Sequence, residues 1–283
     1  MAELYKGAPV AAAINEKTAA DLAMLKEKGV SPTLAILQVG QKDADNAYAG
    51  SAKKRCAGMG IEVKHVVLPE NITEDDLVAN IESLNEDSGV HGVLILRPLP
   101  AHINDDRIRR ALKAEKDIDG ITDVSLGGVF SGNNIGYAPC TAQACMEILN
   151  HYGIELLGKN VCVIGHSLVV GRPVAMMALC KDATVSVCHV NTIDTPSHSR
   201  PADIIIVAVG KAGLVDKKYL SEGQIVIDVG INVNKEGKLC GDLNEEDADG
   251  IVAAYSPVPG GVGSVTTAVL MSHVVDAAKK ASK

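Results

Sequence analysis

The sequence contains no tryptophan and a single phenylalanine, and aromatic residues make up 2% of its 283 positions. Such a chain offers almost no side chains on which nucleic-acid bases can stack. Its net charge of −8 is also opposite in sign to that of the basic surfaces that bind nucleic acids. These features exclude nucleic acid as a partner and require a core built from aliphatic residues.

Other patterns are missing too. No apolar run reaches the roughly 18 residues of a membrane-spanning helix, and the start MAELYKGAPV lacks the basic-then-apolar pattern of a signal peptide. The seven cysteines include no C-x-x-C pair, and the eight histidines show no metal-ligand spacing. We therefore expect a cytoplasmic protein with reduced cysteines, no membrane association and no metal site.

What the chain does contain is a regular alternation of apolar strands and amphipathic helices. Helical periodicity over 10–28, 44–59 and 71–85 alternates with strand patterns at 33–40, 61–69 and 92–100, and further strands follow at 161–164, 184–188, 204–209 and 225–229. This rhythm predicts an α/β fold of two lobes with parallel sheets, flanking a cleft. The Gly- and Asn-rich stretch 126–136 is expected to be a loop or linker.

The most informative stretch is VCVIGHSLVVGRP, residues 161–173. It predicts a strand, a glycine turn and a helix start, an arrangement that presents backbone amides and a helix dipole to an anion. The spacing G-x-S-x-x-x-G differs from the dinucleotide fingerprint G-x-G-x-x-G. On these residues alone, an ordinary strand-to-helix turn remains an alternative.

Four segments taken together resemble the methylenetetrahydrofolate dehydrogenase/methenyltetrahydrofolate cyclohydrolase family. They are KDIDG (116–120), Pro-Cys-Thr (139–141), GHSLVVGRPVA (165–175) and SPVPGGVG (256–263). The third matches the family's G-R-S-x-x-V-G-x-P and the fourth its T-P-V-P-G-G-V-G. The resemblance implies a folate-binding catalytic domain over 1–140, a Rossmann-like NAD(P)-binding domain over 141–265, and a C-terminal helix, 266–283, packing back on the first domain.

The resemblance also implies the reaction and its residues. The family oxidises 5,10-methylenetetrahydrofolate to 5,10-methenyltetrahydrofolate, and most members hydrolyse that product to 10-formyltetrahydrofolate. Tyr48 and Asp119 are the expected catalytic residues. Folate contacts are expected from Tyr48, Leu96, Asp119, Pro259, Gly260, Gly261 and Val262. Cofactor contacts are expected from Gly165, His166, Ser167, Gly171, Arg172, Val190, Gly210 and Ile231. A homodimer and a tetrahydrofolate substrate that can carry a polyglutamate tail are further implications of the resemblance.

Two departures from the family pattern concern hydrolysis. Ala52 stands at the position where the family's Y-V-x-x-K motif has its lysine. Leu96 stands where the family's V-Q-L-P-L-P motif has its glutamine. Neither side chain can relay protons, so we expect a dehydrogenase that lacks cyclohydrolase activity. Two alternatives stay open: a bifunctional enzyme in which Lys53 or a water takes over, and an inert folate- or nucleotide-binding subunit. The charged run Lys53–Arg55 is a solvated helix face that could attract a glutamate tail.

A third departure concerns the cofactor. Many family members carry H-S-R-T, whose arginine meets the 2′-phosphate of NADP, where this chain has CHVNT (188–192). Val190 and Asn191 supply no positive charge for that phosphate. We therefore favour NAD, while Arg172 and Arg200 keep NADP open.

Overall fold

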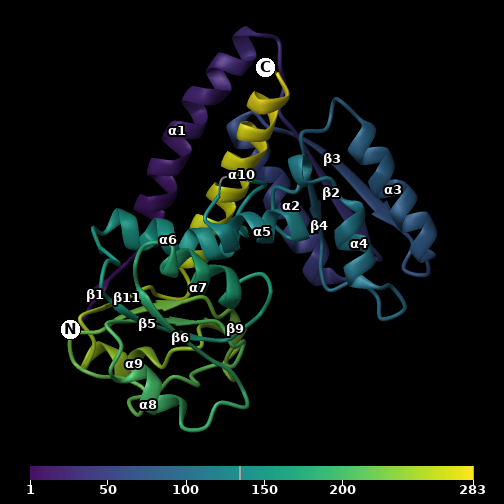
Figure 1. Ribbon diagram of the computed structural model, residues 1–283. Coiled ribbons are helices and arrows are strands. Elements are labelled where there is room, and N and C mark those ends of the chain that lie inside the picture. The colour runs from purple at the N-terminus through teal and green to yellow at the C-terminus, as the bar shows by residue number, and fades with distance from the viewer. Residues whose placement is uncertain (134, 283) are drawn as a thin grey trace. The chain divides into compact units, whose positions relative to one another are not determined.

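The computed structural model describes residues 1–133 and 135–282, and the chain divides into two compact units (Figure 1). The large-sheet unit comprises residues 1–13, 129–133 and 139–266. The small-sheet unit comprises, among the described residues, 14–128, 135–138 and 267–282. Each unit is built on its own parallel sheet, so the predicted α/β fold is confirmed.

The small-sheet unit contains three parallel strands in the order β3-β2-β4. Their bounds are Thr33–Val39 for β2, Glu62–Leu68 for β3 and Gly92–Ile95 for β4. The helices of this unit are α2 (Asp43–Met59), α3 (Glu74–Glu86) and α4 (Asp105–Ala111), with the short 3-10 turn η1 (Ala114–Lys116). The central strand β2 is buried along almost its whole length, as a strand covered on both faces must be.

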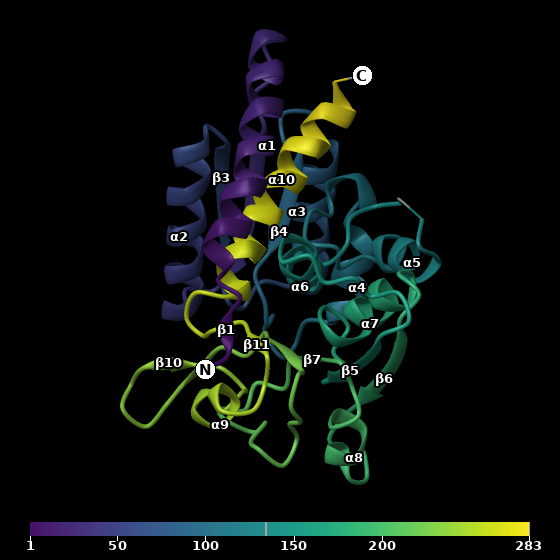
Figure 2. The same ribbon diagram turned by 90° about the vertical axis from the view of Figure 1, so that its left-hand side faces the viewer.

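The large-sheet unit contains six parallel strands in the order β1-β11-β8-β7-β5-β6. Figure 2 shows β1 beside β11 at one edge of this sheet. The strands are β1 (Glu3–Leu4), β5 (Asn160–Ile164), β6 (Thr184–Cys188), β7 (Ile204–Val207), β8 (Ile225–Asp228) and β11 (Ala254–Tyr255). A separate antiparallel pair joins β9 (Asn232–Val233) to β10 (Leu239–Cys240). The helices are α6 (Cys140–His151), α7 (Gly171–Leu179), α8 (Thr195–Ser199) and α9 (Glu245–Asp249).

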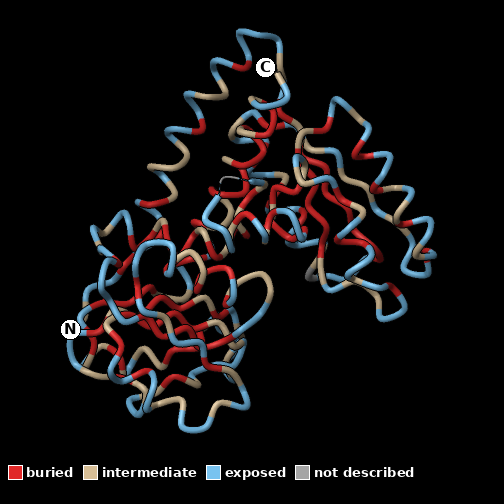
Figure 3. Tube along the Cα trace, viewed as in Figure 1, coloured by how far each residue is buried: buried red, intermediate tan, exposed pale blue. Residues whose placement is uncertain are grey.

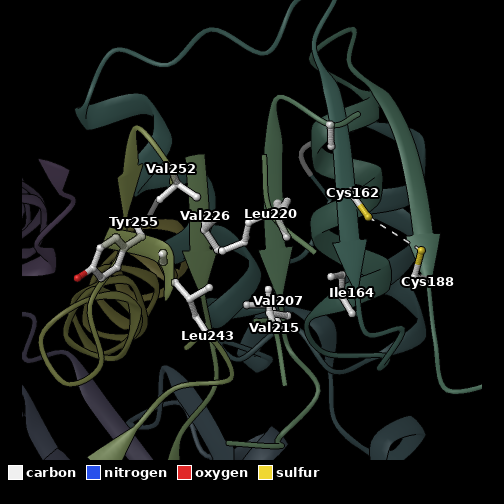
Figure 4. Packing of buried hydrophobic residues seen from close by; sticks show 13 residues of the cluster. Cys162, Ile164, Cys188, Val207, Val215, Leu220, Val226, Leu243, Val252 and Tyr255 are labelled. Atoms are coloured by element: carbon white, nitrogen blue, oxygen red, sulfur yellow. Dashed lines mark hydrogen bonds between the residues drawn. The ribbon is translucent and has the colours of Figure 1, made fainter. Parts of the chain in front are cut away.

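Aliphatic side chains form the core of the large-sheet unit. All four residues of β7 are buried, and its neighbours β5 and β8 are buried over most of their length, as the tube in Figure 3 shows for the middle of this sheet. In Figure 4, Val226 and Val207 point from neighbouring strands into one apolar cluster. Cys162 and Cys188 belong to the same cluster, and their sulfur atoms lie 4.0 Å apart as free thiols. The core thus needs no large aromatic residue.

Three helices belong to both units. They are α1 (Gly7–Glu27), α5 (Asp123–Ser131) and α10 (Val262–Ala281). The first 13 residues belong to the large-sheet unit, whereas the predicted division placed them in the first domain. The boundaries at 140 and 265 therefore stay a prediction. None of the helices in the described residues is both long and apolar enough to cross a membrane.

One sequence expectation is wrong: the stretch 126–136 is not simply a loop, because α5 extends to Ser131. The helix begins where the Thr122 hydroxyl accepts the Ser125 amide, 3.2 Å away, in the manner of an N-terminal cap. The glycines at 127 and 128 obscure this helix because glycine lowers helix propensity. Thr122, a residue type common at helix N-termini, was the sequence feature that could have indicated this helix.

The C-terminal part of α10 packs within the small-sheet unit. His273 lies 2.8 Å, through Nδ1, from the carbonyl oxygen of Ile118, and Lys279 forms an ion pair with Asp21 at 2.7 Å. Burial lowers the pKa of His273 to about 4. The neutral imidazole therefore donates a hydrogen bond to the loop that carries Asp119.

This buried histidine predicts a pH dependence of stability. When a base has a lower pKa in the folded protein than in the unfolded chain, the unfolded chain takes up the proton at a higher pH. The unfolding free energy of the protein therefore falls as the pH falls. Between pH 7 and pH 5 the contribution of His273 to the unfolding free energy should fall by about 2 kcal/mol. Denaturant titrations of wild type and His273→Gln should show a flatter pH dependence in the variant. A His198→Gln control at an exposed site should keep the wild-type slope; equal slopes in all three proteins would contradict the assignment.

Candidate active site

The strand order of the large sheet defines one point at which a ligand is expected. Counting from β5, the order is 2-1-3-4-5, so the direction of winding reverses between β5 and β7. In open parallel sheets, ligands bind outside the carboxyl ends of the strands at such a switch point. Gly165 directly follows β5 and Ala208 directly follows β7. The predicted glycine turn therefore lies at the switch point.

The backbone of this turn requires glycine at two positions. Gly165 has φ of +120°, its amide donates to the Cys188 carbonyl at 2.8 Å, and a Cβ there would collide with the Ala208 carbonyl oxygen. A Cβ on Gly171 would collide with the Gly165 carbonyl oxygen. The turn is thus closed tightly onto the start of α7, where helix amides and the helix dipole favour an anion. This cradle fits the pyrophosphate of a nicotinamide nucleotide.

The turn brings together several of the predicted cofactor residues. Gly165, His166, Ser167 and Gly171 lie within it, and Arg172 is exposed in the first turn of α7. The His166 ring lies 4.8 Å, centroid to centroid, from the ring of His189, which follows β6. These two imidazoles stand side by side at the carboxyl ends of neighbouring strands.

The segment after β6 carries the residues that were expected to choose between cofactors. Val190 is 93% exposed. The Asn191 amide donates to Nδ1 of His189 at 3.2 Å, and the His189 amide donates to the Thr192 hydroxyl at 2.9 Å. The segment is therefore ordered by its own hydrogen bonds and places a neutral amide side chain where the family's arginine would stand.

Two buried carboxylates hold the remaining loops of this edge, and sequence reasoning missed both. Asp242 accepts the amides of Val209, Gly210 and Lys211 at 2.7, 3.0 and 2.7 Å. Asp228 accepts the amides of Gly230 and Leu243 at 2.8 and 2.9 Å. Burial raises the pKa of Asp228 to about 6, against the opposing effect of these amide donors. Acidic residues next to glycines in IDVG (227–230) and GD (241–242) were the available signal.

These carboxylates hold the loops that carry two predicted cofactor residues, Gly210 and Ile231, through bonds to backbone amides. The amide of Gly210 is already used by Asp242, so Gly210 contributes loop shape rather than a free donor. Ile231 follows the loop that Asp228 holds and is 69% exposed. Its exposed apolar side chain lies beyond the carboxyl end of β8.

The predicted folate loop Pro259–Val262 also belongs to the large-sheet unit. Pro259 and Gly260 are exposed, whereas Gly261 and Val262 are buried at the start of α10. The Gly260 carbonyl accepts the Gly7 amide at 2.8 Å, and a Cβ on Gly7 would collide with the Gly261 carbonyl oxygen. Close backbone packing against α1 therefore defines the shape of this turn.

The other predicted folate residues belong to the small-sheet unit. Tyr48 is 46% exposed in the N-terminal half of α2. Ala52, one turn later, is 5% exposed, and Leu96, directly after β4, is 8% exposed. Both positions at which the family carries its hydrolytic lysine and glutamine are thus buried and apolar.

Asp119 lies in a turn built by its neighbour. The buried carboxylate of Asp117 accepts the amides of Ile121 and Thr122 at 2.9 and 2.8 Å, and Gly120 has φ of +70°. Asp119 is half-buried between them. The first aspartate of KDIDG therefore shapes the turn, and the second remains the one predicted to meet the substrate.

A buried glutamine that sequence reasoning missed ties the small sheet to α2. Gln38 is fully buried near the end of β2 and donates to the Gly40 carbonyl at 3.0 Å and to Asn46 at 2.8 Å. Its side-chain oxygen lies 2.9 Å from His65 Nε2. Burial lowers the pKa of His65, and the charge of Lys53 lowers it further. Lys53 thus lies near β3, while Ala52 is packed in the interior. A polar residue within TLAILQV was the available signal.

The glycine turn supports a direct test. Gly165→Ala should lose nucleotide affinity at least tenfold and lower the unfolding free energy by about 1–3 kcal/mol, because of the forced φ and the collision with Ala208. Cofactor titration followed by fluorescence, together with denaturant unfolding, measures both effects. Gly250→Ala is the matched control, since its added Cβ would meet nothing within 4 Å. Equal nucleotide affinity in both variants would contradict the assignment of the Gly165 turn as the nucleotide-binding site.

Comparison with known proteins agrees with this arrangement. The family model described as tetrahydrofolate dehydrogenase/cyclohydrolase, catalytic domain, matches residues 5–119, and the model for the NAD(P)-binding domain of the same family matches residues 139–282. A relative from Clostridium botulinum, named bifunctional protein FolD, is 45% identical over 282 residues and covers 100% of both chains.

Solved structures show the same likeness. The bifunctional FolD methylenetetrahydrofolate dehydrogenase/cyclohydrolase of Campylobacter jejuni is 41% identical, with a TM-score of 0.97 over 99% of each chain. The Trypanosoma brucei methylenetetrahydrofolate dehydrogenase-cyclohydrolase, described as complexed with NADP cofactor and inhibitor, is 33% identical, with a TM-score of 0.93 over 100% of this chain and 99% of that one. On this evidence the chain belongs to the tetrahydrofolate dehydrogenase/cyclohydrolase family.

Proposed function

We propose that this protein is an NAD(P)-dependent dehydrogenase that oxidises 5,10-methylenetetrahydrofolate to 5,10-methenyltetrahydrofolate. The observation that carries the proposal is the two-glycine cradle at the switch point of a sheet whose family binds NAD(P). Retention of Asp119 and of the PGGVG turn argues against an inert binding subunit. The homodimer, the cytoplasmic location and a polyglutamylated substrate remain predictions from the resemblance and the composition.

The residues of the site divide between holding the cofactor and holding the substrate. Gly165, Gly171 and the start of α7 would hold the nucleotide, which supplies a hydride acceptor when bound. Asp119 would orient the pterin by hydrogen bonding, and Tyr48 would border it. Oxidation leaves a cation that the folate nitrogens themselves stabilise, so this step depends on positioning and needs no protein base.

Hydrolysis has a different requirement, because adding water to the methenyl carbon needs a side chain that moves protons. The relatives named bifunctional support retention of this step better than its loss. Ala52 and Leu96 support its loss, because both are buried hydrocarbon side chains. We propose that the second step is absent. The bifunctional alternative rests on the relatives and on Lys53, the lysine next in sequence.

An assay of the two steps decides between these possibilities. With purified protein and 5,10-methylenetetrahydrofolate, reduced cofactor and methenyltetrahydrofolate should accumulate together, and the latter should decay only at its uncatalysed rate. The two species are quantified separately in samples taken from the same reaction. Rapid conversion to 10-formyltetrahydrofolate that is lost in Lys53→Ala would establish the bifunctional alternative.

The same two positions allow a gain of function. The double variant Ala52→Lys with Leu96→Gln restores the family residues and should accelerate decay of methenyltetrahydrofolate at least tenfold, with little change in the oxidation rate. Ala52→Met with Leu96→Met is the matched control, since it adds bulk without a titratable group. Equal decay rates in both double variants would contradict the role assigned to these positions.

Cofactor choice is a separate part of the proposal. We favour NAD, because Asn191 offers no charge to a 2′-phosphate, although His166 and His189 supply nearby hydrogen-bonding groups. Asn191→Arg should lower the KM for NADP about tenfold and leave the KM for NAD nearly unchanged. Steady-state kinetics with each cofactor measures this, with Asn191→Gln as the uncharged control. A wild-type enzyme that already prefers NADP would refute the preference.

A further inference from the structure

A cavity in the small-sheet unit is lined by residues that the proposed reaction does not use. Its volume is about 420 Å³, within the range of small-molecule sites. It follows β4 and is lined by the segment from Arg97 to Ala101, with Ile103 and Asp105. Besides Arg97 and Asp105, the described residues that line it are prolines and aliphatic residues, so Arg97 supplies the positive charge of this lining.

The guanidinium of Arg97 is incompletely satisfied. Its Nε and Nη2 atoms are buried and have no hydrogen-bond partner in the part of the chain that the structure describes. Nη2 lies 2.9 Å from Asp105 Oδ1, so the two side chains form an ion pair, but without hydrogen-bond alignment. A buried donor without a partner is costly, and an unmatched arginine fork is suited to a planar anion.

The chemistry of the walls narrows the anion. A carboxylate accepts two parallel hydrogen bonds from a guanidinium, and the surrounding prolines and leucine favour an apolar or aromatic stem beside it. A strongly hydrated dianion such as free phosphate gains little from those apolar walls. The cavity therefore fits a carboxylate attached to a hydrocarbon segment.

The position of Arg97 in the chain connects this cavity to the folate. It directly follows Leu96, one of the expected folate contacts, and the family's V-Q-L-P-L-P motif has leucine where this chain has Arg97. We propose that the Arg97 cavity binds the α-carboxylate of the glutamate on the folate substrate, an inference that rests on the proposed function. This places the tail at a single fixed cation rather than on the solvated run Lys53–Arg55.

Asp105 has a defined part in this arrangement. Its side chain is 48% exposed and that of Arg97 is 24% exposed, so the carboxylate is the more solvent-exposed partner of this ion pair. A bound substrate carboxylate competes with Asp105 for the same cation. Removing the Asp105 charge should therefore strengthen binding, whereas removing the Arg97 charge should weaken it.

The test measures binding of 4-aminobenzoyl-glutamate by calorimetry or NMR titration, with 4-aminobenzamide as the probe that lacks the carboxylates. Arg97→Leu should weaken binding of the first probe about tenfold and Arg97→Lys less, while Asp105→Asn should tighten it. Arg110→Leu, an exposed arginine paired with Asp123, is the matched control and should change nothing. Binding of 4-aminobenzamide should be the same in every variant.

Leucine at position 97 is the family's own residue, so the variant is expected to fold, and thermal unfolding checks this. Equal affinity of wild type and Arg97→Leu for 4-aminobenzoyl-glutamate overturns the inference. So does an equal loss for both probes, which would show that Arg97 only shapes the loop.

Steady-state kinetics separates this inference from the proposed function. Arg97→Leu should raise the KM for methylenetetrahydrofolate about tenfold with kcat nearly unchanged, and should not affect the analogue that lacks glutamate. If no folate is oxidised while the charge-dependent binding of 4-aminobenzoyl-glutamate persists, the proposed function fails and the carboxylate site stands.

Discussion

The organisation of this protein depends on supplying hydrogen-bond partners to the backbone where parallel strands end. Beyond the last ladder bond, amides and carbonyls have no strand to pair with, and burying them unpaired is costly. Buried polar side chains meet this need: Gln38 near the end of β2, Asp117 in the KDIDG turn, Asp242 for the loop after β7, and Asp228, the last residue of β8, for the loop that follows it. The loops that carry the candidate site residues are therefore held by side chains that need not touch a ligand.

This separation explains what sequence could and could not foresee. The apolar runs that became β2, β5 and β7 were evident, since strands buried on both faces read as continuous aliphatic segments. The glycine turn was also evident, because its residues are contiguous in the sequence at 161–173. The partners of Asp242 were not, because the amides that donate to its carboxylate lie about thirty residues away in the sequence and only the fold brings them together. The two-residue strands β1 and β11 were missed because they are too short to show a period.

The candidate site combines a backbone shape set by tightly packed glycines with side chains that depart from the family motifs. Backbone features such as the Gly165 turn and the contact of Gly7 with Gly260 leave no room for a side chain. The departures from the family motifs, at 52, 96, 97 and 191, fall at positions that carry side chains rather than at these glycines. The proposed differences in proton transfer and cofactor choice therefore concern side chains placed on the fold of the family.

The helices shared between the two units have a consequence for biosynthesis. Residues 1–13 belong with 139–266, and residues 14–128 belong with 267–282. During translation the N-terminal segment must wait for β11, about 250 residues later, before β1 gains the strand with which it pairs. The small-sheet unit likewise lacks His273 and its helix until the last residues leave the ribosome. Neither unit can be completed from an uninterrupted piece of the nascent chain, so both depend on nearly the whole polypeptide having been made.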